Sequence, residues 1–186
     1  MTPVWLKLRQ INTGLRQSHN IAPSKQFAEK VPMQIEELSK QASLELLAEE
    51  RFGRLACAKE SQPYITPFYY TYYEDTICSF TTVGQKITWM RANPLVCVEV
   101  DRIKSSQQWS SVIVYGRYLE LPISEWQPTC EKIWNLLNQH EVRWEPGLAK
   151  TIIDGRVRPL VPVYFRILID QITGHRASLE GGSAQL

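Results

Sequence analysis

Three consecutive segments between residues 54 and 82 are rich in aromatic and β-branched side chains and are separated only by short polar turns. Aromatic and β-branched residues favour strands, and such short turns can join only antiparallel neighbours. The sequence therefore predicts a tight antiparallel meander. Its strands are RLACAKE (54–60), YITPFYYTYY (64–73) and TICSFTT (76–82), and its turns are Ser61-Gln62-Pro63 and Glu74-Asp75.

Three further strands are predicted after this meander, at 95–103, 109–122 and 161–172. Gly116 interrupts the second of them and indicates a bulge or a sharp bend, which barrels need at their corners. Few helices separate the strands, and the regular alternation of βαβ units is absent. We therefore expect a mainly β protein, a six-stranded antiparallel barrel of the Greek-key type.

Helices are predicted in three places. Residues 34–50 carry apolar side chains at helical spacing, and Ser43 is a plausible N-cap for a fresh start within them. A short helix over 85–93 opens at Gly84 and is stopped by Pro94. The third helix begins at a capping box and has a regular apolar stripe. The capping box is Ser124 with Gln127, and the stripe is Trp126, Cys130, Ile133, Trp134 and Leu137.

The length of 186 residues suits one domain with an appendage. We expect an N-terminal extension at 1–32, a single domain at 33–177 and a mobile tail at 178–186. The extension is basic, because its first acid is Glu29. We interpret it as an arm, with an organelle transit segment as the alternative.

Charge and hydropathy exclude some partners. The net charge of +2 gives no indication of nucleic acid. No apolar run approaches the roughly 20 residues of a membrane helix, so no membrane partner is expected. The four cysteines form no CxxC pair and match no zinc spacing, so no metal site is predicted. Three of them lie in apolar, strand-like contexts, which predicts free thiols, a reducing compartment and a cytoplasmic protein.

The best local candidate for chemistry is the stretch from Phe80 to Lys86, which leads from a strand through a glycine into a helix. A helix N-terminus presents free N–H groups and a partial positive charge, and therefore accepts phosphate. Thr81 and Thr82 add hydroxyl groups, and Lys86 adds a full charge. The alternative is an ordinary strand-to-helix turn with a solvated lysine. The spacing is not that of a P-loop.

The segments RFGRLACA, QPYITPFYYTYY, TICSFTTVGQK, MRANPLVCVEV, WSSVIVYGRYLEL and ITGHRA follow one another in this order. Together they resemble the pyridoxamine-5′-phosphate-oxidase-like, flavin-binding split-barrel family. The resemblance covers about residues 33–177 and is nearest to the nitroimidazole-reductase-like branch. It implies a split β-barrel that forms a homodimer with FMN at each of two sites in the subunit interface.

The resemblance also implies which residues hold the cofactor. The flavin ring would lie along the second strand, and the phosphate would bind at the turn that helix-terminus physics already favours. The fifth strand would approach the flavin from across the interface. These residues are Thr66, Pro67, Phe68 and Tyr69 on the second strand, Thr81, Thr82 and Lys86 at the turn, and Trp109, Ser110 and Ser111 on the fifth strand.

Two departures from the family pattern limit the expected chemistry. Phe80 stands where nitroimidazole-reductase-like proteins commonly have a histidine, which argues against nitroimidazole reduction. The second strand has no basic residue over 65–71, which argues against vitamin B6 oxidation. We expect an FMN-dependent oxidoreductase acting on an unidentified small molecule, with Tyr69, Trp109 and Trp144 shaping the substrate pocket and no catalytic side chain identified.

Two alternatives remain open at this point. One is a haem- or flavin-binding sensor or carrier without turnover, in which His175, just after the last strand, could be an axial haem ligand. The other is a scaffold that keeps the dimer interface without a cofactor. For His175 a solvated loop histidine is the competing interpretation.

Overall fold

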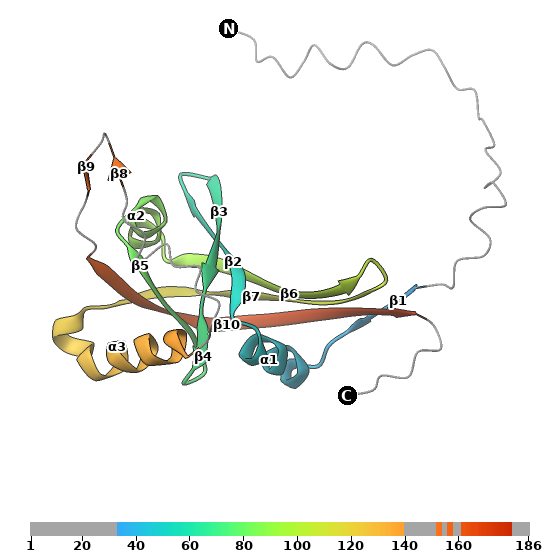
Figure 1. Cartoon of the computed structure of the whole chain (residues 1–186). Helices are drawn as coiled ribbons and strands as arrows, with labels where there is room; N and C mark the ends of the chain where they lie inside the picture. The colour runs from blue at the N-terminus through green and yellow to red at the C-terminus, as the bar shows by residue number, and fades with distance from the viewer. Residues whose placement is uncertain (1–32, 140–151, 154–155, 158–160, 180–186) are drawn as a thin grey trace, which may run out of the picture. The chain divides into compact units, whose positions relative to one another are not determined.

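The computed structural model describes residues 33–139, 152–153, 156–157 and 161–179 (Figure 1). The extension predicted at 1–32, Trp144 and residues 180–186 of the predicted tail lie outside the described residues. The elements in chain order are β1 (Met33–Glu37), α1 (Lys40–Glu49), β2 (Phe52–Lys59), β3 (Gln62–Tyr69), β4 (Thr71–Tyr73), β5 (Thr76–Thr82), α2 (Gln85–Ala92), β6 (Leu95–Ser105), β7 (Gln108–Leu121), α3 (Ile123–Asn138), β8 (Ile152–Ile153), β9 (Arg156–Val157) and β10 (Pro162–Leu179).

The main sheet is antiparallel and eight-stranded, in the order β3-β2-β6-β7-β10-β5-β4, with β1 added to β10. Its two ends, β3 and β4, are consecutive in the chain and separated only by Tyr70, so one continuous segment belongs to both edges. The predicted mainly β, barrel-type class is confirmed. All six predicted strands are present. The sheet has more strands because Tyr70 divides the second one and because β1 is an addition.

The two turns of the meander differ in how well the sequence predicted them. Glu74 and Asp75 form the second turn as expected, with positive φ angles of 49° and 55°. The first turn lies at Glu60 and Ser61, with φ angles of 51° and 65°, rather than at 61–63. Positive φ at both central residues matches the twist of a two-residue hairpin. Pro63 is accommodated inside β3 because β3 is an edge strand.

The prediction of one helix over 34–50 is wrong in its first part. Met33–Glu37 is a strand that pairs with the end of β10, from Met33 opposite Leu179 to Glu37 opposite His175. The helix α1 begins only after Ser39, whose side chain accepts a 3.1 Å hydrogen bond from the Ala42 N–H group. Helical spacing of apolar residues misled the prediction, because the partner that makes a strand here lies about 140 residues away in sequence.

The predicted N-cap at Ser43 is also wrong. Ser43 lies inside α1, is completely buried, and donates its hydroxyl to the Ser39 carbonyl at 3.0 Å. It packs closely against β10, since a Cβ built on Gly174 would lie 2.6 Å from the Ser43 hydroxyl oxygen. A small side chain is therefore needed here for packing rather than for capping.

The last strand is longer than the predicted 161–172, because β10 continues to Leu179 (Figure 1). Its second half is polar in sequence, but it is paired on one side with β1 and on the other with β7. The irregularity predicted at Gly116 is confirmed. The register of β10 shifts between Ile169 and Gln171, directly opposite Gly116.

The third helix contains its predicted stripe but not its predicted capping box. Cys130 and Ile133 are buried, whereas Trp126 is 39% exposed. The N-cap residue is Pro122, no side chain caps the helix, and Trp126 has non-helical φ/ψ angles. The Gln127 amide donates instead to Glu131 at 3.0 Å. Pro128 has no N–H group for the helix ladder, so the first turn is kinked.

The buried side chains form two clusters on opposite faces of the sheet. The larger one fills the barrel interior between the inward-facing residues of the strands, α1 and α2. The smaller one lies under α3. The inward residues alternate along β6 and β7, with Val96, Val98, Val100, Val112 and Val114 all buried. Among the described residues, no helix has the length and apolar character needed to cross a membrane.

Candidate functional site

Lys86 lies in the first turn of α2 and has an unusual environment for a lysine. Burial lowers the pKa of its ammonium group, and the neighbouring Cys57 thiol on β2 acts weakly in the opposite direction. Among the described residues, none forms an ion pair or a hydrogen bond with this ammonium group. A desolvated cation without an anion is unfavourable unless a ligand supplies the missing charge.

The backbone at the start of α2 adds to this positive site. Gly84 is the N-cap residue, its backbone is extended with φ −164°, and no side chain caps the helix. The first N–H groups of a helix have no partner within the helix. The Gly84 carbonyl is already used, since it accepts hydrogen bonds from the Thr88 N–H and hydroxyl groups. The free N–H groups and Lys86 thus lie at the same turn, an arrangement that can accept an anion.

Thr81 and Thr82 end β5 just before this turn. Successive strand residues point to opposite faces, and Thr81 is 4% exposed while Thr82 is half-buried. Within the described part of the chain, neither hydroxyl forms a hydrogen bond. Both remain able to donate to a ligand.

The four predicted residues on β3 do not all present their side chains in one direction. Phe68 is buried and packs against Tyr70 with ring centroids 5.6 Å apart, and its backbone groups face β2, opposite Gly53. Tyr69 is half-buried beside Phe52, and Pro67 is exposed. Because β3 is the last strand of the sheet order, its outer backbone edge has no strand partner among the described residues. Backbone groups on that edge can bind a planar polar ligand.

Trp109, Ser110 and Ser111 lie elsewhere in the same chain. Lys86 is beside Cys57, which pairs with Val96 of β6, while Ser111 pairs with Asp101 five residues further along that strand. A strand rises about 3.4 Å per residue, so the separation along the sheet is about 17 Å. Within one subunit the structure does not bring these three residues to the Lys86 site.

The sheet face opposite the barrel interior, which we call the outer sheet face, carries a row of apolar side chains beside charged ones. One row across it consists of Ile65, Ala56, Cys97 and Tyr115, which are neighbours in the strand registers. Ile65 is 64% exposed and Tyr115 is 51% exposed. Contiguous exposed apolar area of this kind marks an interaction surface.

A charged cluster lies at the centre of the outer sheet face. The Arg54 guanidinium donates to Glu99 at 2.9 Å and also to Asp101. The Ser111 hydroxyl lies 3.5 Å from Glu99. The hydrogen bonds that Arg54 donates to Asp101 and Glu99 raise the pKa of its guanidinium group. The guanidinium is therefore already paired within the chain.

Comparison with known proteins identifies the family. Residues 39–176 match the profile of the family described as Pyridoxamine 5'-phosphate oxidase. This chain belongs to the pyridoxamine 5'-phosphate oxidase family. The family predicted from the order of the sequence segments is thus confirmed.

Three known proteins are similar to this chain in sequence or in fold. An uncharacterized protein of Rhizobium meliloti is 35% identical over 144 residues, which are 75% of this chain and 93% of the relative. The crystal structure of an FAD-binding protein from Mesorhizobium loti is 39% identical, with a TM-score of 0.66, and covers 79% of this chain and 99% of its own. An FAD binding protein from Mycobacterium smegmatis shares the fold, with a TM-score of 0.51 at 23% identity, over 77% of this chain and 98% of its own.

The sequence did not predict every residue of the site in this family member. The Cys57 thiol of β2 lies close enough to the Lys86 ammonium group for each to affect the other's pKa, whereas the sequence predicts only a buried thiol there. Nothing in its spacing from Lys86 indicates the contact, because α2 reaches β2 only in the folded barrel. The open edge of β3 was likewise visible only from the strand order.

His175 is not in a loop after the last strand, as the sequence suggested, but inside β10. It is exposed and lies between Ser111 of β7 and Glu37 of β1 in the sheet. The described residues contain no group of three or more His, Cys, Asp or Glu side chains placed to hold a metal ion.

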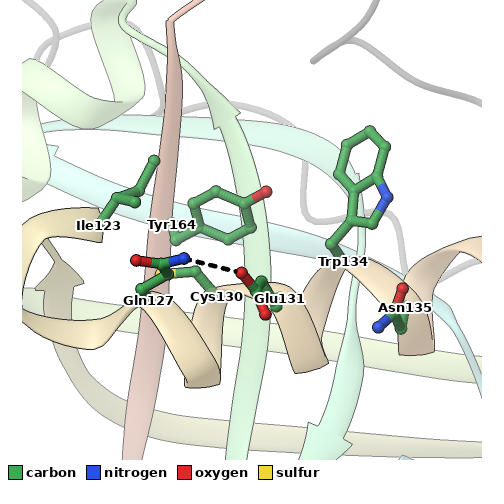
Figure 2. A pocket seen from close by; sticks show the side chains of 7 residues that line it. All are labelled: Ile123, Gln127, Cys130, Glu131, Trp134, Asn135 and Tyr164. Carbon is green, nitrogen blue, oxygen red and sulfur yellow. Dashed lines mark hydrogen bonds between the residues drawn. The ribbon is translucent and has the colours of Figure 1, made fainter.

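A separate pocket of about 420 Å³ lies between α3 and β10 (Figure 2). Trp134 of α3 and Tyr164 of β10 point into it (Figure 2). Along α3, the Gln127 amide donates a hydrogen bond to the Glu131 carboxylate (Figure 2). Phe80 of β5 closes the aromatic cluster, 5.1 Å from Trp134 and 5.4 Å from Tyr164 between ring centroids. None of the predicted cofactor residues lines this pocket. Phe80 therefore has a packing role at the position where the relatives' histidine was expected.

Proposed function

We propose that this protein binds FMN, with the phosphate at the N-terminus of α2. The observation that carries the proposal is Lys86, a largely desolvated ammonium group without an anion among the described residues, at an uncapped helix start. A phosphate dianion supplies the missing negative charge and accepts hydrogen bonds from the free N–H groups. Thr81 and Thr82 add hydroxyl donors at the same turn.

The ring of the flavin would lie along the open edge of β3. By the alternation of the β2–β3 pairing, the backbone groups of Pro67 and Tyr69 face this edge, whereas those of Thr66 and Phe68 face β2. The Tyr69 carbonyl already accepts a hydrogen bond from the Ser79 hydroxyl, so its N–H group is the one available, and its half-buried ring offers an apolar contact. Pro67 has no N–H group, so at that residue only the carbonyl can take part. The residues present therefore fit a planar ligand with a phosphate group at one end.

A homodimer would complete the site. The outer sheet face is apolar over the row from Ile65 to Tyr115, and a second copy of this face would cover it. Trp109, Ser110 and Ser111 of the partner subunit would then approach the flavin, which explains why they lie apart from Lys86 within one chain.

The chemistry we propose is that of a flavin-dependent oxidoreductase acting on a small molecule. FMN, when bound, supplies hydride or electron transfer at its ring, and the protein supplies binding, orientation and exclusion of water. Tyr69, and Trp109 of the second copy in the dimer, would bound the substrate side. The four cysteines are free, which supports a cytoplasmic location.

Titration of the purified protein with FMN, FAD and riboflavin tests this proposal through the visible spectrum and the quenching of flavin fluorescence. FMN is expected to bind more tightly than riboflavin. Lys86→Ala should weaken FMN binding by about tenfold to a hundredfold, since a charge-assisted bond of about 1.5–3 kcal/mol is lost. Lys132→Ala, at an exposed position on α3, is the matched control and should bind normally.

Three outcomes would contradict the proposal. Free flavin fluorescence in the presence of protein would exclude flavin binding, and a Soret band shifted and sharpened relative to free haem would favour the haem-binding alternative. Tight binding of FAD with negligible binding of FMN would exclude FMN as the cofactor while leaving a flavin site, as in the FAD-binding relative from Mesorhizobium loti.

A further inference from the structure

The far end of α2 is held by an ion pair to the central part of the sheet. The Arg91 guanidinium forms two hydrogen bonds with the Glu120 carboxylate of β7, from Nε at 2.8 Å and from Nη2 at 2.7 Å. Such a planar two-bond fork fixes direction as well as distance. The Tyr118 hydroxyl donates to the same carboxylate at 2.7 Å.

Tyr118 connects this fork to the barrel interior. Its side chain is 8% exposed, and its ring lies 5.5 Å from Phe165 between centroids. Its backbone N–H group donates to the Pro94 carbonyl, just after α2, at 2.8 Å. The carboxylate that receives Arg91 is therefore itself held by a rigid core residue.

The helix needs such an anchor because it is short. An isolated helix of eight residues is not stable in water, so its direction is set by tertiary contacts. Ile87 and Met90 bury one side of it in the core, but Val83, Gly84 and Gln85 at its start are exposed. The buried side chains and the Asn93 amide, which donates to the Ala58 carbonyl at 3.0 Å, hold the last turn of the helix, and the Arg91 fork adds a directional restraint there.

We infer that the Arg91–Glu120 pair is a positioning element that makes the site selective for a phosphorylated flavin. The inference rests on the proposed function. Arg91 follows Lys86 by five residues, or about 8 Å along the helix, so it does not touch the phosphate itself. It holds the direction of the N–H groups and of Lys86. Both side chains of the pair are partly exposed, at 47% and 31%, so the pair adds little to overall stability.

The test compares FMN with riboflavin, which lacks the phosphate, in Arg91→Met, Arg91→Lys and Glu120→Gln. We expect the dissociation constant for FMN to rise about tenfold in each variant, as when charge-assisted bonds lose their geometry. Riboflavin binding should stay within about twofold of the wild type, because the ring contacts on β3 are untouched. Unchanged circular dichroism and melting temperature establish that each variant is folded.

Glu120→Gln separates positioning from simple charge. It removes an acid and leaves the Arg91 cation, so attraction through space alone predicts equal or tighter FMN binding. Positioning predicts weaker binding. Equal or tighter FMN binding in Glu120→Gln, or a parallel loss of FMN and riboflavin in the variants, overturns the inference while the proposed function stands. A wild-type protein that binds no flavin overturns both.

Discussion

The hydroxyl of Tyr70 donates a hydrogen bond of 2.8 Å to the backbone carbonyl of Leu47. Leu47 lies in the last turn of α1, where carbonyl groups lack partners within the helix. Tyr70 is completely buried at the point where β3 passes into β4. Burial raises the pKa of its hydroxyl far above the ordinary value, so the group remains a donor at every working pH. One side chain thus connects the helix to both edges of the sheet.

Tyr70→Phe is expected to lower the free energy of unfolding by about 1–2 kcal/mol. It removes the hydrogen bond and leaves the Leu47 carbonyl buried without it. Chemical denaturation measures the change. Tyr115→Phe is the control, because the Tyr115 hydroxyl forms no hydrogen bond within the described residues, and it should change the free energy by less than about 0.5 kcal/mol. Equal losses in the two variants would contradict the expectation.

Gly116→Ala is expected to destabilise the protein by about 1–3 kcal/mol through overpacking. A Cβ at this position would overlap the Leu168 carbonyl oxygen and lie 2.8 Å from Cγ2 of Ile167. Backbone carbonyl groups in a paired strand cannot move aside. Gly84→Ala is the control, because a Cβ at Gly84 would lie 4.0 Å from the nearest heavy atom. Its expected destabilisation is under about 1 kcal/mol, from the lower preference of alanine for the N-cap position. Thermal and urea unfolding should rank the two variants in this order.

The affinity for FMN is expected to fall as pH rises through the lowered pKa of Lys86. Phosphate binds the charged ammonium form, so binding is fully present below that pKa and is lost above it. The arginine in Lys86→Arg keeps its charge at high pH. The FMN affinity of this variant should therefore not change with pH, even if it is lower than that of the wild type. Fluorescence titrations between pH 7 and about 10 measure the effect, since the phosphate group is already a dianion above about pH 6. Identical pH profiles for the two proteins would exclude Lys86 as the phosphate ligand.

Tyr115→Glu is expected to convert the proposed dimer into monomers. The substitution puts a charge on the outer sheet face beside Cys97, and a desolvated charge without a partner opposes association. Sedimentation velocity measures the assembly. Val161→Glu is the control, because Val161 is 63% exposed but lies just before the start of β10, away from this row. Dissociation by both variants, or by neither, would argue against the outer sheet face as the interface.

Glu120 should contribute a small, acid-sensitive part of the stability. The hydrogen bond from Arg91 lowers its pKa, so its contribution is present above the ordinary carboxyl pKa and is lost as pH falls through the lowered value. The difference in unfolding free energy between wild type and Glu120→Gln should therefore shrink on acidification. It should stay below about 1 kcal/mol, because the pair is partly exposed. A difference that grows at low pH would contradict this assignment.

The sequence alone determined the strands of the meander, the short helix between Gly84 and Pro94, the irregularity at Gly116 and the family. Each depends on residues close in the chain, such as β-branched runs, turn residues and a helix stop, or on the order of such segments. The proposed anion site at the start of α2 can be read from the sequence for the same reason, because Gly84 and Lys86 are neighbours. These features need no knowledge of which strands pair.

Only the tertiary structure decided that residues 33–37 form a strand, that Tyr70 divides β3 from β4, and that Arg91 reaches Glu120. β1 owes its state to β10 about 140 residues away, and Arg91 meets Glu120 across 29 positions. Helical spacing and strand alternation are set within a few residues. These contacts, in contrast, form only when folding of the sheet brings segments that are distant in the sequence side by side. The position of Lys86 was therefore visible in the sequence, but its desolvation beside Cys57 and the fork that holds its helix were products of the fold.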